Sequence, residues 1–226
     1  MRNIVVTQPS ASVGDYLKAV WETAGSGVAS TKGVADRLSV SSASVTNMFA
    51  RLQGMGLALY EPYRGASLTR RGRAEALRLV RRHRLIETFL LEYLGYSWED
   101  VHEEAERLEH AVSDEFTERL AELLGHPERD PHGAPIPTSD GALPPEDSRP
   151  LSGTEAGGRF VISRVENRDP AVLTYLRGIG LVPGRSLRVR EVVRALDGVV
   201  TAEDEDGVSH ALGAPLARSI LVRHRA

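Results

Sequence analysis

Six histidine and glutamate residues stand in two short windows of this 226-residue chain, at spacings that helices bring onto one face. His83 and Glu87 are four residues apart in the segment HRLIE. In VHEEAERLEH the spacing is 0, 4, 7 and 8, which spans an arc of about 100° on a helix. The chain must therefore carry two helices here, with one polar face each. The residues of the second window are His102, Glu106, Glu109 and His110.

Imidazole nitrogens and carboxylate oxygens aimed at one place are the donors that a divalent transition metal binds. The alternative is that a glutamate-rich helix face is only a solvated surface. The chain contains no cysteine, which excludes disulfides, thiolate zinc sites and cysteine nucleophiles. A metal site here would therefore use nitrogen and oxygen donors.

Composition predicts a globular protein of one to three small domains, with 41% hydrophobic and 26% charged residues. We expect no transmembrane helix, because no window carries eighteen consecutive apolar residues. We also expect no signal peptide, because the N-terminus has a single arginine and its longest apolar run is IVV. The expected compartment is the cytoplasm, and no membrane partner is expected.

The net charge of −3 hides a strong asymmetry along the chain. Residues 1–85 carry 13 basic and 5 acidic side chains, whereas residues 86–155 carry 4 basic and 18 acidic ones. The basic first third indicates a polyanionic partner. The acidic middle third indicates a cation site or a solvated helical region.

Residues 1–72 read as a winged helix-turn-helix DNA-binding domain. Helical periods at 13–23, 31–38 (capped by Thr31) and 42–56 precede a hairpin at 57–69 with a basic, aromatic tip. In the third helix we expect Met55 on the buried side. The alternative is a small helical domain that binds no nucleic acid.

The third helix opens with small polar residues, which let a recognition helix sit deep in the major groove. Asn47 is placed to reach a base edge, and the hydroxyl groups to meet phosphates, unless they serve only as caps and solvated surface. Arg51 and, at the hairpin tip, Arg64 would contact the DNA backbone. The predicted DNA-binding residues are Ser41, Ser42, Ser44, Thr46, Asn47, Arg51 and Arg64.

The remaining chain divides into three further segments. Residues 73–138 predict a helical dimerisation and metal-binding domain, with Ser97 and Ser113 as helix caps. Residues 139–157 lack periodicity and predict a linker. Residues 158–226 carry about five short alternating strands, typical of a small barrel. The predicted fold class is α+β, mainly α, with an SH3-like third domain.

An enzyme is not expected. The segment His102-Glu103-Glu104-Ala105-Glu106 departs from the zinc-protease pattern HExxH, because its fifth position is Glu106 instead of histidine. The chain also shows no nucleophile elbow, no Walker loop and no GxGxxG motif after a strand. The competing functional class is a winged-helix regulator that metal does not switch.

Nearly the whole chain resembles the diphtheria-toxin-repressor (DtxR/MntR) family of metal-dependent transcriptional regulators. The segments that carry the resemblance are DYLKAVWE, LTRRGR, HRLIETFL, VHEEAERLEHAVSD, DPHGAPIP and GIGLVPG. The resemblance implies a homodimer whose two reading heads, drawn together by metal, fit double-stranded palindromic operator DNA.

The resemblance also implies two metal sites. His83, Glu87 and His102 match the family's ancillary site, and Asp15, Glu106, Glu109 and His110 match its primary site. Asp15 belongs to the first helix, so a metal would tie the DNA-binding domain to the dimerisation helices. Asp169 stands near an extra carboxylate of some members, but it reads better as a helix cap before Pro170.

Departures from the family pattern indicate which metal is bound. Iron-sensing members have cysteine at the position of Glu106 and methionine at the position of Asp15. Manganese-sensing members have glutamate and aspartate at these two positions. Hard oxygen donors suit Mn²⁺. Some manganese sensors carry another glutamate at the position of Lys18. The lysine in this chain argues against a closely bridged pair of metals like theirs. The sequence therefore predicts a Mn²⁺-responsive repressor, with Fe²⁺ as the rival cofactor.

Overall fold

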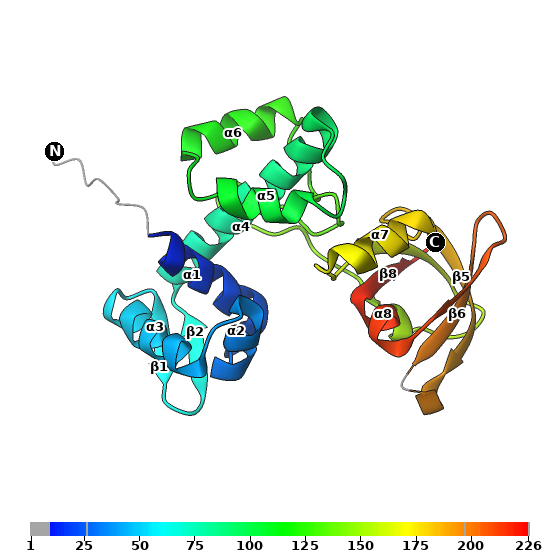
Figure 1. The fold of residues 1–226 in the computed structure, drawn as a ribbon, viewed down its shortest axis with the longest axis horizontal. Helices are drawn as coiled ribbons and strands as arrows, with labels where there is room; N and C mark the ends of the chain where they lie inside the picture. The colour runs from blue at the N-terminus through cyan, green and yellow to red at the C-terminus, as the bar shows by residue number, and fades with distance from the viewer. Residues whose placement is uncertain (1–9, 26, 197, 226) are drawn as a thin grey trace. The chain divides into compact units, whose positions relative to one another are not determined.

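The computed structural model describes residues 10–25, 27–196 and 198–225. The chain forms two compact units (Figure 1): one runs to Arg82 and includes Pro137–Ala142, and the other takes His83–Ile136 with Leu143 onward. Among the described residues, no helix combines the length and apolar character needed to cross a membrane.

The first unit contains the predicted winged helix. Three helices, α1 (Ala11–Ala24), α2 (Thr31–Leu38) and α3 (Ser42–Gly54), precede the antiparallel strands β1 (Ala58–Glu61) and β2 (Gly65–Leu68). The core lies where the apolar faces of these helices meet the hairpin. Its fully buried side chains include Leu17, Val45, Phe49 and Leu52.

Serine side chains cap the N-terminal ends of α2 and α3. Ser30 accepts a hydrogen bond from the Gly33 amide at 3.0 Å, so Ser30 is the cap of α2 and the expectation for Thr31 was wrong. Ser41 caps α3 by accepting from the Ser44 amide. Met55 is 39% exposed, contrary to the expectation, because it follows the last turn of α3 and leaves its buried face.

The hairpin turns at an exposed tip. Tyr63 adopts φ of 65° there and is fully exposed. At Gly65 a Cβ atom would stand 2.1 Å from the Ala29 carbonyl oxygen, so only glycine permits the approach of this backbone. Ala29 and Ala66 exchange two backbone hydrogen bonds at this point, which anchors the hairpin to the helices.

The long helix α4 (Arg70–Leu94) belongs to both units. Thr69 caps it by accepting from the Gly72 amide at 3.1 Å, and Gly95, at φ of 70°, follows its end. Two further helices, α5 (Val101–Leu108) and α6 (Asp114–Leu123), pack against its second half. Helix α5 is shorter than expected: the chain makes a turn after Ser97, and Glu109 and His110 follow the helix.

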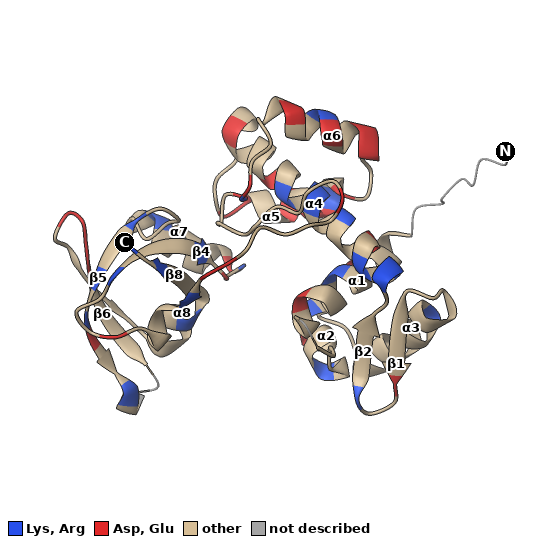
Figure 2. Cartoon of the chain, turned by 180° about the vertical axis from the view of Figure 1, so that it is seen from behind, with Lys and Arg blue, Asp and Glu red and all other residues tan. Residues whose placement is uncertain are grey.

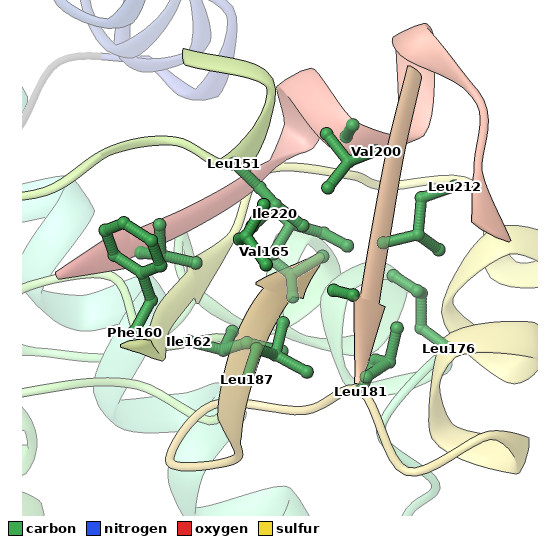
Figure 3. Packing of buried hydrophobic residues seen from close by; sticks show 14 of the residues in the cluster. Leu151, Phe160, Ile162, Val165, Leu176, Leu181, Leu187, Val200, Leu212 and Ile220 are labelled. Carbon is green, nitrogen blue, oxygen red and sulfur yellow. The ribbon is translucent and has the colours of Figure 1, made fainter. Parts of the chain in front are cut away.

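The third domain is a six-stranded antiparallel sheet in the order β3-β8-β4-β5-β6-β7. The sheet carries register shifts in β4 and β5, which help a sheet to curve. Side chains from the strands and from helix α7 converge in one core, as Figure 3 shows for Phe160, Leu176 and Val200. The strands and short helices are β3 (Arg149–Pro150), η1 (Leu151–Gly153), β4 (Arg159–Val165), α7 (Pro170–Gly178), β5 (Ser186–Val193), η2 (Arg194–Leu196), β6 (Val199–Asp204), β7 (Ser209–Leu212), α8 (Ala214–Ser219) and β8 (Ile220–His224).

Part of the segment expected as a linker is folded into this domain. β3 pairs with β8, Leu151 lies in the core with no exposure, and Thr154 is equally buried. The sheet therefore starts at Arg149, inside the 139–157 segment. The mixed α+β architecture, with a winged helix, a helical domain and an SH3-like domain, is as predicted.

Candidate metal centre and nucleic-acid interface

Helix α4 presents the first two metal-ligand candidates from one buried face. His83 and Glu87 are one helical turn apart, and His83 Nε2 lies 2.9 Å from Glu87 Oε1. Both residues are less than 7% exposed. Burial fixes their direction, so both side chains point from α4 toward α5.

Helix α5 brings His102 to the same point. Its Nδ1 lies 2.9 Å from His83 Nε2 and 3.0 Å from Glu87 Oε1. Three donor atoms from two helices thus stand within about one hydrogen-bond length of one another. Donor atoms bound to one metal at about 2.1 Å in octahedral geometry are separated by about 3 Å, so this trio needs little movement to receive an ion.

Glu109 connects this trio to the remaining candidates. Its side chain is fully buried, with Oε2 2.7 Å from His83 Nδ1 and Oε1 3.4 Å from His110 Nε2. When the ring proton of a neutral His83 sits on Nδ1, it is donated to Glu109 and the Nε2 lone pair faces Glu87 and His102. This contact with Glu109 therefore fixes the orientation of the His83 imidazole.

Glu106 is the more accessible carboxylate of the cluster. Its Oε1 lies 3.6 Å from His102 Nε2 and 4.0 Å from His83 Nδ1, and its side chain is 35% exposed. His83, His102 and Glu106 form one group with metal-binding spacing. The structure thus brings Glu106, expected in the primary site, next to the two histidines of the ancillary site.

Asp15 is half-buried on α1, in the other compact unit, whereas the six other candidate ligands lie in the second unit. Asp169, at the start of α7, accepts a hydrogen bond from the Ala171 amide at 2.9 Å. Asp169 therefore acts as the cap of that helix, which was the favoured expectation.

The electrostatics of Glu87 hold it ionised. Its complete burial acts to raise its pKa, but the neighbouring His83 and the hydrogen bonds from His102 and His83 outweigh burial and lower the pKa well below its usual value. A carboxylate that stays charged among imidazoles is available as a ligand.

Two further residues near Glu87 were missed in the sequence. Asp130 and His132 come from the loop after α6, and ligand atoms of Glu87, Asp130 and His132 lie within 4.8 Å of one another. Burial and the charge of Glu87 raise the pKa of Asp130, while Arg84 opposes them. The available signal was the motif DPHG, in which aspartate and histidine are two residues apart in a proline- and glycine-rich loop.

The loop that holds these two residues is fixed on both sides. Trp98 Nε1 donates to the Pro131 carbonyl at 2.9 Å, and Val165 N, at the end of β4, donates to the His132 carbonyl at 2.9 Å. At Gly133 a Cβ would stand 2.0 Å from the Ser163 carbonyl oxygen. Loop, helices and third-domain sheet therefore meet next to the candidate metal centre.

The chemistry of the cluster suits a divalent cation. Glu87, Glu106 and Glu109 bring three carboxylates against His83 and His102, and each carboxylate oxygen or neutral imidazole nitrogen is a Lewis base. Buried carboxylates need a compensating positive charge. A metal ion would supply it when the imidazoles are neutral.

Several hydroxyl groups at the start of the predicted recognition helix form hydrogen bonds within that helix. Ser41 accepts from the Ser44 amide at 3.1 Å and shares a 2.9 Å contact with the Ser44 hydroxyl, and Thr46 donates to the Ser42 carbonyl at 2.9 Å. These hydroxyls thus serve the helix itself. Asn47 and Arg51 are exposed on the following turns.

The tip of the hairpin projects charged and aromatic groups. Arg64 pairs with Glu61 at 2.8 Å, and both side chains are more than 60% exposed. Such an exposed pair is weak and can exchange its partner for a phosphate. Tyr63 beside it is also fully exposed.

Family models match all three regions of the chain. Residues 9–66 match the iron dependent repressor N-terminal DNA binding domain, and residues 69–138 match the metal binding and dimerisation domain of the same family. Residues 149–224 match the FeoA domain.

Relatives and solved structures agree with these matches. The chain is 34% identical to the diphtheria toxin repressor of Corynebacterium efficiens over 78% of this chain and 68% of that protein. It is 37% identical to the iron-dependent repressor IdeR of Mycobacterium bovis, over 54% of each.

Among solved structures, a manganese-dependent transcriptional repressor in complex with manganese is 39% identical, with a TM-score of 0.88 over 94% of this chain and all of that one. The manganese regulator SloR is 35% identical, with a TM-score of 0.78 over 94% of this chain and 98% of that one. The chain belongs to the diphtheria toxin repressor family of metal-dependent, DNA-binding transcriptional repressors.

Proposed function

We propose that the chain is a transcriptional repressor of metal-ion homeostasis that Mn²⁺ activates for operator binding. The observation that carries the proposal is the trio of His83 Nε2, Glu87 Oε1 and His102 Nδ1, each within 3.0 Å of the other two. His83 and Glu87 are buried, and the trio joins two helices, so a metal there would fix their relative position.

The choice of Mn²⁺ rests on hard donors. Glu106 and Asp15 supply oxygen, and the chain has no cysteine, so the site lacks the sulfur that favours softer ions. A manganese-dependent repressor with 39% identity supports the same choice. Fe²⁺ is the second candidate, because the family models and IdeR are described as iron-dependent.

In the proposed activation, His110, Glu106 and Glu109 follow the family's primary site and Asp15 completes it from α1. Metal bound by Asp15 would restrict the orientation of the DNA-binding domain. Activation is then a population shift, in which metal selects the arrangement that fits the operator. The same reasoning gives His83, Glu87 and His102 the ancillary role.

DNA contact is proposed through α3 and the hairpin tip. Asn47 would read a base edge, Arg51 and Arg64 would neutralise phosphates, and Ser41, Ser42, Ser44 and Thr46 would contact the backbone where their hydroxyls remain accessible. Because a repressor acts where the DNA is, we place the protein in the cytoplasm.

A homodimer on a palindromic operator is proposed through an apolar surface of α4 and α6. Tyr93, Phe116 and Leu123 are 53%, 47% and 55% exposed, and Tyr93 donates to the Leu123 carbonyl, which ties the two helices together. Phe116 and Leu123 are seven residues apart and therefore lie on one face of α6, and exposed apolar and aromatic side chains are typical of an interface core. A second copy is the occupant that the family's dimerisation domain suggests.

Phe116→Asp should produce monomers in analytical ultracentrifugation, whereas the control Glu115→Gln, at the neighbouring residue, should not.

The direct test is fluorescence anisotropy of an operator duplex titrated with Mn²⁺, anaerobic Fe²⁺ and Zn²⁺, against a chelator control. We expect binding at lower Mn²⁺ than Fe²⁺ concentration and none with chelator. His110→Ala should abolish the metal response. Equal binding with and without chelator would contradict the metal switch.

Selectivity has a sharper test in Glu106→Cys. A thiolate in place of a carboxylate should shift the response from Mn²⁺ toward Fe²⁺ and Zn²⁺. The matched control is Glu103→Cys on the exposed side of the same helix. An unchanged Mn²⁺-to-Fe²⁺ ratio in Glu106→Cys would refute the hard-donor argument.

A further inference from the structure

The outer face of the third-domain sheet carries an uninterrupted row of arginines. Arg159 on β4 pairs directly opposite Arg188 on β5. On its other side, Arg225 N donates to the Arg159 carbonyl at 3.1 Å, which places Arg225 beside Arg159. Arg223 lies opposite Val161, two residues along β4. All four arginines, here called the arginine face, are exposed.

The arginine face points away from the core of the domain. The intervening residues Phe160 and Leu187 are opposite each other and almost completely buried, and side chains alternate between the two faces of a sheet. Figure 2 shows basic segments on β5 and β8 near the C-terminus of the chain. These arginines therefore have no part in the packing of the barrel.

The row goes against the local rules of sheet stability. Like charges directly opposite one another on neighbouring antiparallel strands repel, and here two such pairs share Arg159. Elsewhere in the domain, arginines meet carboxylates: Arg164 pairs with Glu146, Arg177 with Glu99, and Arg190 with Glu203. Arg188 lies opposite Glu203 on β6, but the Glu203 carboxylate pairs with Arg190. Within the described part of the chain, Arg225 donates to the Ser186 hydroxyl, and Arg159, Arg188 and Arg223 form no ion pair.

We propose that the arginine face binds the phosphate backbone of duplex DNA, as a second DNA contact besides the winged helix. Guanidinium groups bind phosphate oxygens in bidentate fashion, and adjacent strands hold the arginines about 4.8 Å apart along the row. This inference rests on the DNA-binding function. Once the winged helix engages an operator, phosphates of the same molecule reach the third domain at high effective concentration.

A protein partner with an acidic surface, such as the helical domain of a second copy, is the alternative occupant. Its exposed carboxylates are partly neutralised: Arg107 pairs with Glu103 and Glu104, and Arg119 pairs with Glu115. Backbone phosphates carry no such internal cations, so charge complementarity favours DNA.

The test compares the full-length protein with Arg159→Gln/Arg188→Gln and with the control Arg164→Gln/Arg177→Gln, which removes two paired arginines of the same domain. Anisotropy measures binding to a non-specific duplex without metal, and to operator duplexes of core length and with 15-bp flanks in Mn²⁺. Salt dependence is recorded for each. Thermal melting checks folding, and removal of like charges should leave the melting temperature of the first variant unchanged or higher.

We expect Arg159→Gln/Arg188→Gln to weaken binding to flanked and non-specific duplexes several-fold, and to reduce the log–log salt slope by about 1 to 2, whereas the control keeps the wild-type slope. Identical slopes and affinities in all three proteins would overturn the proposal. Unchanged DNA binding with lost binding to polyglutamate would overturn it in favour of an acidic protein partner. The non-specific duplex needs no metal, so the arginine face is tested even where metal-dependent operator binding fails.

Discussion

Two clusters in this chain both combine histidine and carboxylate groups, but they differ in the positive charge that faces the carboxylates. Around His83, the carboxylates of Glu87 and Glu109 face imidazoles from α4 and α5. In the third domain, Asp204 contacts His210 at 3.0 Å and Arg185 at 3.1 Å. Arg185 also pairs with Glu205 and Asp206. A permanently charged guanidinium thus pairs with the carboxylates of the second cluster.

The difference shows that the kind of cationic side chain decides whether such a cluster is purely structural or can bind an added metal ion. Arginine stays charged at any physiological pH, so the Asp204 cluster is complete when the chain folds. Imidazoles are neutral over much of the same range and bind metal only in that form. The His83 cluster is therefore open to an external ion.

The largest effect is expected for Glu87→Ala. Loss of the carboxylate that contacts both imidazoles should reduce Mn²⁺ affinity by on the order of 100-fold or more, as calorimetric titration would measure. Glu92→Ala, exposed farther along the same helix, is the control. Equal affinities for the two variants would show that the metal binds elsewhere.

Glu109→Gln should have a smaller effect, about 10-fold to 100-fold, because the amide keeps an oxygen that can bind a metal in the proposed primary site. The amide still reaches His83 Nδ1, but it carries no charge to raise the basicity of the ring. A loss as large as that of Glu87→Ala would show that the charge of Glu109 is as important for metal binding as the Glu87 carboxylate. An unchanged affinity would remove it from the centre.

The comparison also predicts that Asp204→Asn leaves metal affinity unchanged and lowers the melting temperature of the third domain by several degrees at pH 7. The hydrogen bond from His210, which leads, and those from Val208 N, Arg185 and Asp206 N outweigh burial and lower the pKa of Asp204 far below its ordinary value. Stability from a lowered carboxyl pKa is present above the unfolded pKa of about 3.9 and is lost as pH falls toward the folded value.

Melting curves between pH 7 and pH 2.5 check this prediction. The gap between wild type and Asp204→Asn should narrow as pH falls below about 4, because the wild-type carboxyl group then begins to lose this contribution. Glu155→Gln, exposed in the same domain, is the control. A gap that stays constant down to pH 2.5 would show that charge on Asp204 does not matter.

Sequence reasoning worked best where local signals decide the structure. The helical periods and turn residues of the first unit predicted α1, α3 and the hairpin to within a few residues, and helix spacing predicted the pairing of His83 with Glu87. Local patterns fail where tertiary contacts decide. β3 has two residues, and Leu151 is one apolar residue among prolines and serines, so neither shows periodicity.

The site was incompletely predicted for the same reason. Asp130 and His132 reach Glu87 through a loop fixed by Trp98 and by β4, and no residue spacing encodes those contacts. The assignment of Glu109 to one of two separate sites missed its hydrogen bond to His83. Helical spacing gives the face of a side chain but not its partner on another helix.

The most direct test of the central claim is anomalous diffraction at the manganese absorption edge from crystals grown with Mn²⁺. We expect a strong anomalous peak for a manganese ion that is bound by His83 Nε2, Glu87 and His102. The His83 Nδ1–H should still donate to Glu109. A map with no manganese at these side chains, from protein that nevertheless binds its operator in a Mn²⁺-dependent manner, would contradict the account.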